Sequence, residues 1–549
     1  MLFHIFITFV KITHMKSLSL RFFCLFSLVV LLAACQKQDS LSLSVNTVRG
    51  TAAGGSLSFE IKCSGSWQMS ALPDFVQCEP RSGDGTKTIT VHFQKNLFRT
   101  ERSGSVTITF NTLSSVITLV QDANTSDNSP PSAPVLLSPQ NDQDQIPIMS
   151  SFSWSPSVDE NKDVISYYFC YSVNQQLSWE IVPCDQQTSF TPITPLFQGE
   201  TTYCWKVIAR DNYSGTTESA VSSFTTAVST YRLEGEVRTL MENRPVNGVN
   251  LVFLCDGCIA EDLSIDGKYD QMAERALEYF FDIEPYKTYK DYFNAYLVYG
   301  FSNESGVSYG ADNLLKNTAF SLMCDKDSRT STHMSCDQNK VLTYALKTPI
   351  TDLAQTLVIV IANDNRYAGT CWMWANGQAI ALLTSKEEGY PYNFKGTLQH
   401  EAGGHGFAKL ADEYINAATA ATRNRNDISA QHLNGAYANV DITNDPATIY
   451  WKHFIGLPAY EHVGAYEGGY YFAAGVWRPE SGSCMINNVA YYNAPSREAI
   501  VKRIMLIAKE PYSFEAFLAK DVAAVPAYLP PPPTKLQEHL YLHPPVWVK

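Results

Sequence analysis

The sequence has no block of lysine and arginine, and its 41 basic residues are outnumbered by 54 acidic ones, for a net charge of −13. A nucleic-acid-binding protein needs a concentrated positive surface, so the composition excludes that class of function. Charged residues are few, at 17%, but hydrophobic residues reach 45%, which is ordinary for globular proteins and excludes wholesale disorder. At about 100–200 residues per domain, the 549 residues predict three to five domains.

No apolar run long enough to span a membrane is present either. After Met15, Lys16 and Arg21 introduce the apolar residues 22–32, which are fewer than the roughly 20 residues that cross a bilayer. This pattern predicts a cleaved secretory signal. The signal ends in Leu-Ala-Ala-Cys at residues 32–35, which resembles the lipobox of bacterial lipoproteins.

That resemblance implies a lipoprotein signal peptide at residues 1–35, with Cys35 as the site of lipid attachment. Gln36 and Lys37 follow, and neither is the Asp that indicates retention in the inner membrane. We therefore expect an exported lipoprotein at the outer membrane or cell surface, with the periplasmic face as the alternative. Its lipid anchor would be its only contact with a membrane.

Residues 36–122 contain short alternating strands, at residues 56–62, 88–93 and 105–110, each bounded by Gly, Ser or Asn. Alternation with a period of two is typical of strands with one buried face, and Trp67 is a candidate core residue. The order of these features is similar to a BACON-type domain. The resemblance implies an all-β sandwich that contacts glycans or mucin, and a plain spacer is the alternative.

A polar linker is predicted at residues 123–131, and a second all-β sandwich at residues 132–228. In residues 202–209, Tyr203, Trp205, Val207 and Ala209 alternate onto one face, as expected of an inner strand of a sandwich. Together with residues 152–156 and 166–172, this pattern resembles a fibronectin type III module, in which Tyr203 would be the corner tyrosine. The module is interpreted as a stalk, with ligand binding as the alternative.

The pattern changes to alternating strands and helices in residues 229–520. Residues 250–254 and 357–362 are apolar runs typical of buried strands, and residues 269–280 place their apolar side chains on one helical face. They predict an α/β or α+β domain large enough to form its own core. Residues 521–549 are predicted to be a Pro-rich, irregular tail.

A metal-binding motif lies in residues 399–414 of this domain. His400, Glu401 and His405 resemble the zinc helix of metallopeptidases, in which two His bind the metal and the Glu acts on a water. The two His are usually four residues apart, but here they are five apart, which leaves them about 140° out of register on a regular helix. A local π-type widening restores a shared face, and Gly403 and Gly404 favour it. The dipeptidyl-peptidase III family shows the same longer spacing.

The surrounding residues resemble the IgA-peptidase family of zinc metallopeptidases. The similarity includes Leu410–Tyr414 after the second His, the strand and Asp-Gly turn at residues 253–257, residues 293–298, residues 481–485 and residues 494–498. It runs from about residue 231 to residue 509 in the family's order. The resemblance implies a metzincin-like zinc metallopeptidase domain that takes a protein or peptide as its substrate.

The resemblance also implies roles for individual residues. His400 and His405 would bind zinc, and Glu401 would be the general base. Asp412 is the expected third metal ligand, by analogy with families that place an Asp or His there, and Glu413 and Glu498 remain alternatives. Met485 would form the methionine turn, an apolar floor under the His ligands.

Two further features concern the substrate. Tyr491 and Tyr492 are candidates for stabilising the oxyanion, with packing as the alternative for both. Residues 367–370, after the strand at residues 357–362, are expected to form a rim against which an extended peptide pairs by β-addition.

We therefore predict two all-β sandwich modules followed by a zinc endopeptidase that is anchored by lipid and acts on an extracellular protein. Family resemblance suggests an IgA-like or mucin-like host glycoprotein, although no residue selects it. The main alternative is a surface lipoprotein that binds glycans or mucin and whose peptidase-like domain is inactive. A thiol redox function for Cys255 and Cys258 is a more distant alternative.

Overall fold

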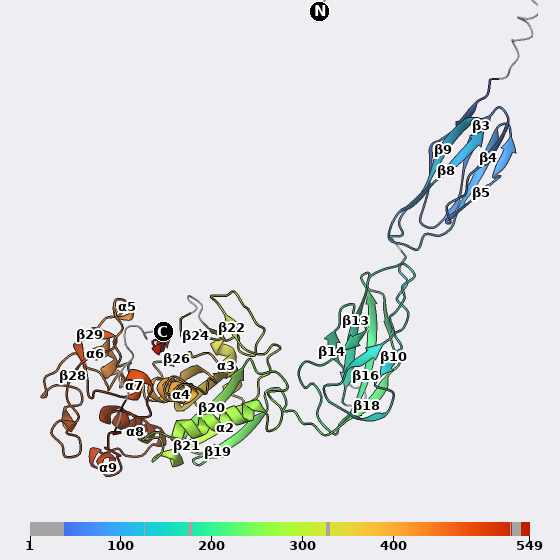
Figure 1. Ribbon diagram of the computed structural model, residues 1–549. Helices are drawn as coiled ribbons and strands as arrows, with labels where there is room; N and C mark the ends of the chain where they lie inside the picture. The colour runs from blue at the N-terminus through green and yellow to red at the C-terminus, as the bar shows by residue number, and fades with distance from the viewer. Residues whose placement is uncertain are drawn as a thin grey trace, which may run out of the picture.

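The computed structural model describes residues 38–125, 127–173, 178–324, 330–527, 529 and 540–548. Two β-sandwiches follow one another in a line, and a larger mixed α/β unit lies beyond them (Figure 1). This confirms the predicted fold class. The predicted signal peptide, Cys35 and Pro530–Pro533 lie outside the described residues. Within these residues, no helix has the length and apolar character needed to cross a membrane.

The first sandwich packs a four-stranded sheet, β1-β3-β7-β5, against a five-stranded sheet, β2-β9-β8-β4-β6. Trp67 is 2% exposed in the core between them, and its indole N–H donates to the carbonyl group of Gly85 at 2.9 Å. The strands are β1 (Leu41–Leu43), β2 (Thr47–Gly50), β3 (Gly55–Cys63), β4 (Ser66–Met69), β5 (Val76–Glu79), β6 (Ser82–Asp84), β7 (Lys87–Phe93), β8 (Arg102–Phe110) and β9 (Leu113–Gln121).

The second sandwich packs the sheet β10-β12-β15 against β11-β18-β16-β13-β14, in which β17 also pairs with β16. Trp205, Val207 and Ala209 of β16 are fully buried, as their alternation predicted. The hydroxyl group of Tyr203 accepts a hydrogen bond from the backbone N–H of Gln198 at 2.9 Å. The strands are β10 (Leu136–Ser138), β11 (Gln143–Ile146), β12 (Phe152–Trp154), β13 (Ile165–Ser172), β14 (Glu180–Pro183), β15 (Ser189–Phe190), β16 (Thr202–Asp211), β17 (Thr216–Glu218) and β18 (Ser222–Thr226).

The α/β unit is built on a seven-stranded sheet of order β19-β21-β20-β25-β27-β26-β30. Strands β21, β20, β25 and β27 are parallel, whereas β19 runs antiparallel to β21 and β26 runs antiparallel to β27. The continuous apolar runs of β20 and β25 arise because both faces of the sheet are covered. The strands are β19 (Val237–Glu242), β20 (Val249–Asp256), β21 (Phe293–Val298), β25 (Thr356–Ala362), β26 (Gly369–Trp374), β27 (Ala379–Thr384) and β30 (Val546–Val548).

Helices cover both faces of this sheet. A large core joins one face to α2, η3 (Gln399–Phe407) and α8, and a smaller core lies on the face covered by α3. Other helices are α2 (Lys268–Phe281), α3 (Gln338–Ala345), α5 (Ala417–Ala420), α6 (Asn426–Leu433), α7 (Cys484–Asn487), α8 (Ala494–Ala508) and α9 (Phe514–Leu518), with short turns η1 (Lys290–Tyr292), η2 (Leu353–Gln355) and η4 (Lys452–Phe454). Small sheets are formed by β22 (Ser308–Tyr309), β23 (Met323–Cys324) and β24 (Met334–Ser335), and by β28 (Tyr466–Gly469) and β29 (Phe472–Arg478).

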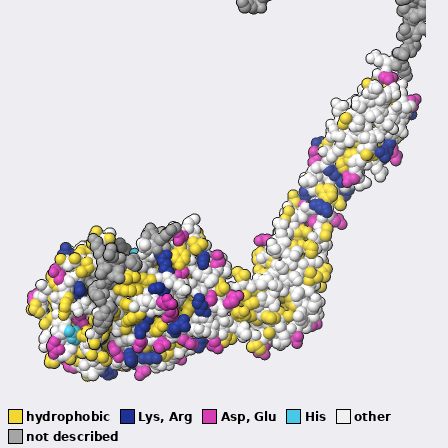
Figure 2. Space-filling view, viewed as in Figure 1, with side chains coloured by type: hydrophobic (Ala, Val, Ile, Leu, Met, Phe, Trp, Pro, Cys, Tyr) yellow, Lys and Arg dark blue, Asp and Glu magenta, His cyan; other side chains and the backbone are white. Residues whose placement is uncertain are grey.

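The end of the chain differs from the predicted irregular tail. Strand β30 adds in parallel to the edge of the sheet beside β26, and the C-terminus lies next to this strand (Figure 1). Periodicity could not reveal this strand because only three residues form it. Charges of both signs are interspersed on the visible face of the molecule (Figure 2).

We expect the first sandwich to unfold independently of the α/β unit. Trp67→Ala should destabilise the sandwich by about 3–5 kcal/mol, the usual cost of removing a buried large aromatic side chain. Differential scanning calorimetry of the full chain should show one transition moved to lower temperature and the others unchanged. Leu57→Ala is the control, since Leu57 in the same module is 43% exposed. A common shift of all transitions would contradict independent folding.

Candidate metal centre

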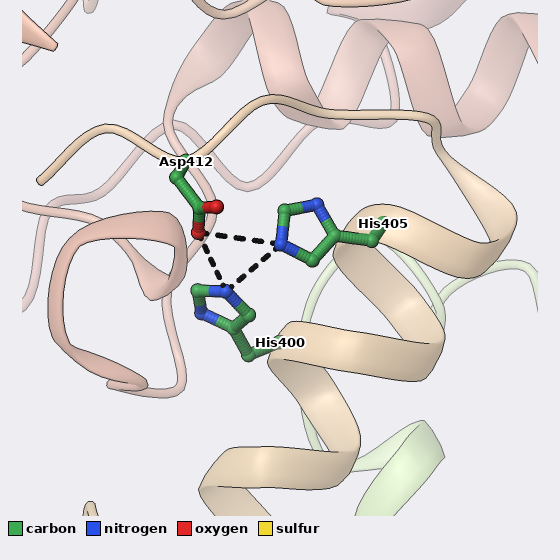
Figure 3. A group of neighbouring side chains, drawn as sticks. All are labelled: His400, His405 and Asp412. Atoms are coloured by element: carbon green, nitrogen blue, oxygen red, sulfur yellow. Dashed lines mark hydrogen bonds and ion pairs between the residues drawn. The ribbon is translucent and has the colours of Figure 1, made fainter. Parts of the chain in front are cut away.

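The widened helix predicted from the His spacing is present. Helix α4 (Phe394–Leu398) continues directly into the π-helix η3 (Gln399–Phe407). Within this wider turn, His400 and His405 point toward each other, and their Nε2 atoms lie 3.1 Å apart (Figure 3). A regular α-helix would have directed the two rings far apart.

The two glycines of the motif permit close packing. A Cβ atom on Gly404 would overlap Sδ of Met485, and a Cβ atom on Gly403 would overlap the hydroxyl group of Tyr492. Neither glycine has a positive φ. The predicted need for glycine is therefore explained by neighbouring side chains, in addition to any freedom of the backbone.

Backbone carbonyl groups fix both imidazole rings. Nδ1 of His400 lies 3.0 Å from the carbonyl oxygen of Cys484, and Nδ1 of His405 lies 2.8 Å from that of Leu410. Because a carbonyl group only accepts, each Nδ1 carries the proton in the neutral ring, and each Nε2 lone pair is left for a metal.

Asp412 completes the cluster from the chain that follows the helix. Its Oδ1 lies 3.0 Å from Nε2 of His400 and 3.3 Å from Nε2 of His405, and its Oδ2 accepts a hydrogen bond from the Tyr471 hydroxyl group at 2.6 Å. Ligands about 2.0–2.1 Å from a tetrahedral zinc ion lie about 3.3 Å from one another. The donor set of two imidazoles and one carboxylate therefore fits zinc in both chemistry and spacing.

The electrostatics of the cluster follow from its burial, since all three side chains are 0–1% exposed. Burial lowers the pKa of His400. Burial also favours the neutral forms of His405 and Asp412, but their mutual attraction outweighs it. This attraction raises the pKa of His405 and, with hydrogen bonds from both imidazoles, lowers the pKa of Asp412.

Glu401 lies on the same helix beside the first ligand. It is fully buried, and burial raises its pKa to about 8. Neither carboxylate oxygen has a hydrogen-bond partner among the described residues. A Cβ atom on Gly369 of β26 would lie 3.0 Å from Cγ of Glu401, so this side chain rests against the first residue of the edge strand.

The structure does not bring the alternative ligands Glu413 and Glu498 to the cluster. The carboxylate of Glu413 accepts hydrogen bonds from Asn439, Asn493 and Ser483, at 2.6–2.8 Å. Glu498 instead contacts His453, Lys502 and Tyr512. Among the described residues that we considered as ligands, only Asp412 joins the two histidines.

The candidate oxyanion residues have other partners. The Tyr491 hydroxyl group donates to Glu480 at 2.6 Å, and the Tyr492 hydroxyl group donates to the carbonyl group of Gln399. These contacts favour the packing alternative for both. Met485 is fully buried against Gly404, the position expected of an apolar floor under the helix.

Two residues of the site were not found in the sequence. Tyr471 holds Asp412 from 59 positions away, and Tyr286 donates to the carbonyl group of Gly403 at 2.7 Å from 117 positions away. Neither tyrosine lies in a motif, so no local signal could have indicated them.

Two other groups of reactive residues have simpler explanations. Cys255 and Cys258 form a disulfide bond and are fully buried, whereas redox-active cysteines are partly exposed.

Asp159, Asp163 and Asp211 lie close enough to share a cation, but Asp163 already binds the Arg99 guanidinium group and Asp211 accepts a hydrogen bond from Asn128. These contacts join the two sandwiches.

Gly404→Ala should destabilise the protein by about 1–3 kcal/mol, the usual cost of overpacking, and should lower its affinity for zinc. Adding Met485→Ala removes the overlapping atom. The double variant should therefore lose less free energy of unfolding than the two single variants lose together. Urea denaturation and zinc titration measure both effects. Gly464→Ala is the control, because its new Cβ atom would meet only Tyr466 at 3.6 Å. If the losses of free energy of unfolding add, Gly404 and Met485 are not coupled.

No curated protein matches the chain. A Bacteroides ovatus GH5 xyloglucanase in complex with a heptasaccharide is 14% identical, over 22% of this chain and only 30% of its own, with a TM-score of 0.16. The fibronectin type III domain of human fibronectin type III domain containing protein 3 is 24% identical, over 20% of this chain and 95% of its own, with a TM-score of 0.16.

A similar domain of the human collagen alpha-1(XX) chain is 24% identical, over 19% of this chain and 91% of its own, with a TM-score of 0.14. Scores this low carry no argument about function. The family comparison is more informative, because its match contains η3, both histidines and Asp412. Residues 240–459 match the model of the IgA Peptidase M64 family, the family that the sequence resembles, and this match supports a peptidase.

Proposed function

We propose that the chain is a zinc-dependent endopeptidase that hydrolyses peptide bonds of an extracellular protein. The observation that carries this proposal is the convergence of Nε2 of His400, Nε2 of His405 and Oδ1 of Asp412 within 3.0–3.3 Å of one another. Three protein ligands leave a fourth position of a tetrahedral ion for water or substrate, as in catalytic zinc sites.

Glu401 is the proposed general base. When bound, zinc polarises the scissile carbonyl group and lowers the pKa of the attacking water. The Glu401 carboxylate, which has no hydrogen-bond partner among the described residues, takes the proton of that water and passes it to the leaving amine. The carbonyl groups of Cys484 and Leu410 keep both imidazoles in the tautomer that binds metal.

The proposed setting is the surface of a cell. The lipobox at Cys35 supports anchoring by lipid, and the two sandwiches would then carry the peptidase away from the membrane. An IgA-like or mucin-like glycoprotein is the proposed substrate, on family resemblance alone, and the first sandwich is the proposed site of glycan contact. The inactive-peptidase alternative depended on the longer His spacing, and the convergent ligands favour an active site instead.

Purified protein should contain one zinc ion per chain and should cleave protein substrates in a chelator-sensitive manner. Glu401→Gln should keep the zinc and lower kcat by about 10²–10⁴-fold, the usual contribution of a general base. Metal analysis and a peptide-cleavage assay measure the two effects. Asp412→Asn should lose zinc, whereas the matched control Glu498→Gln should retain it. Zinc-free, folded wild-type protein would contradict the proposal.

Cys35→Ser should abolish incorporation of labelled fatty acid and release the protein from the membrane fraction. The physical reason is that acyl chains supply about 0.8 kcal/mol of membrane affinity for each buried CH₂ group. Fractionation of cells that express each form measures the change, and Cys24→Ser is the matched control within the signal segment. Unchanged membrane association of the Cys35 variant would exclude the lipid anchor.

A further inference from the structure

The last described residues of the chain lie between two cores of the catalytic unit. We call residues 540–548 the C-terminal segment. Trp547 packs against both the large core under the sheet and the small core that contains Tyr414 and Tyr471. Leu542 is 3% exposed. The segment therefore occupies a groove between two parts of the same unit.

Side-chain hydroxyl groups hold three successive carbonyl groups of this segment. Tyr367 donates to the carbonyl group of Leu540 at 3.0 Å, Thr332 to that of Tyr541 at 3.2 Å, and Tyr414 to that of Leu542 at 2.7 Å. These hydrogen bonds recognise the peptide backbone. Such contacts involve groups that every peptide carries, whatever its side chains.

The same segment then pairs with the edge of the sheet. Val546, Trp547 and Val548 of β30 lie in parallel register with Trp372, Met373 and Trp374 of β26. An edge strand offers unpaired backbone groups, and addition of an extended peptide to such an edge is a common mode of peptide recognition.

This groove borders the proposed metal centre. A Cβ atom on Gly369, the first residue of β26, would lie 3.0 Å from Cγ of Glu401, so this end of β26 is close to the Glu401 side chain. Tyr414 follows Asp412 by two residues, and its ring centroid lies 5.3 Å from that of Tyr471, whose hydroxyl group donates to Asp412. Glu401 and the three ligands are at most 1% exposed, so a substrate cannot reach them without displacing part of the protein.

We propose that the groove formed by β26, Thr332, Tyr367 and Tyr414 is the binding site for an extended peptide substrate, and that the C-terminal segment occupies it as a competitor within the chain. The choice of a peptide ligand rests on the proposed peptidase function. The segment also indicates a side-chain preference. The Tyr541 ring stacks on Tyr414 at 4.2 Å, and Leu542 is buried, so the site favours an aromatic residue followed by an aliphatic one.

Competition can be measured without catalysis in the full-length Glu401→Gln protein. The probe is a fluorescent peptide with the sequence of residues 540–548, and its binding is followed by fluorescence anisotropy. The double change Tyr541→Ala and Leu542→Ser weakens the hold of the chain's own segment. It should therefore tighten binding of the probe at least tenfold. Leu433→Ser is the control, since Leu433 is 90% exposed, and it should leave the probe's affinity unchanged.

A third change tests the groove itself. Added to the double variant, Tyr414→Phe keeps the stacked ring and removes one hydrogen bond, so it should weaken binding of the probe about threefold to tenfold. Unchanged affinity in both the double and triple variants would overturn the proposal.

Hydrogen exchange of the Glu401→Gln protein provides a second measurement that needs no release variant. Saturating probe should speed amide exchange in residues 540–548, because the probe displaces them. Exchange that stays slow at saturation would overturn the proposal even where the double variant does not fold. If probe and segment compete but the protein with Glu401 cleaves nothing, the peptidase proposal fails and the peptide site stands. Cleavage without competition would reject this inference alone.

Discussion

The candidate metal centre depends on one constraint, which is that two histidines five residues apart must place their Nε2 atoms around one point. A π-helical turn meets it, but such a turn is rare and its carbonyl groups need partners. The structure supplies those partners from distant segments. Tyr286 donates to the carbonyl group of Gly403, and Tyr492 donates to that of Gln399. The tyrosine that we considered for the oxyanion thus supports the helix that carries the ligands.

Two adjacent acids show why the sequence could not assign every role. Asp412 and Glu413 are both fully buried, yet Asp412 meets two imidazoles and Glu413 meets two amides and a hydroxyl group. Attraction to the imidazoles lowers the pKa of Asp412, whereas burial raises the pKa of Glu413 to about 7. The difference comes from partners such as Asn439 and Asn493, which lie 26 and 80 positions away from Glu413. Spacing along the chain contains no information about such contacts.

Local patterns nevertheless predicted much of the fold. Alternation predicted β3, β7, β8 and β16 to within a few residues, apolar runs predicted β20 and β25, and His400, Glu401 and His405 predicted the position of η3. Strand β30 pairs with residues 372–374 of β26, whereas a pairing peptide was expected at residues 367–370, and that peptide was a substrate. Three residues after a Pro-rich stretch have no periodicity, and their pairing with β26 depends on the completed sheet.

The edge strand β26 has two conflicting requirements. An exposed edge invites aggregation, but a peptidase that reads backbone groups needs the edge to remain accessible. A covering segment from the same chain reconciles them if its hold is modest. Each hydrogen bond contributes about 0.5–1.5 kcal/mol net, and a substrate can replace each one with an equivalent bond. Competition between the C-terminal segment and a substrate is therefore governed by side-chain burial and by effective concentration. The effective concentration of a tethered segment reaches the millimolar range. A substrate must exceed that threshold through better side-chain contacts or through local enrichment.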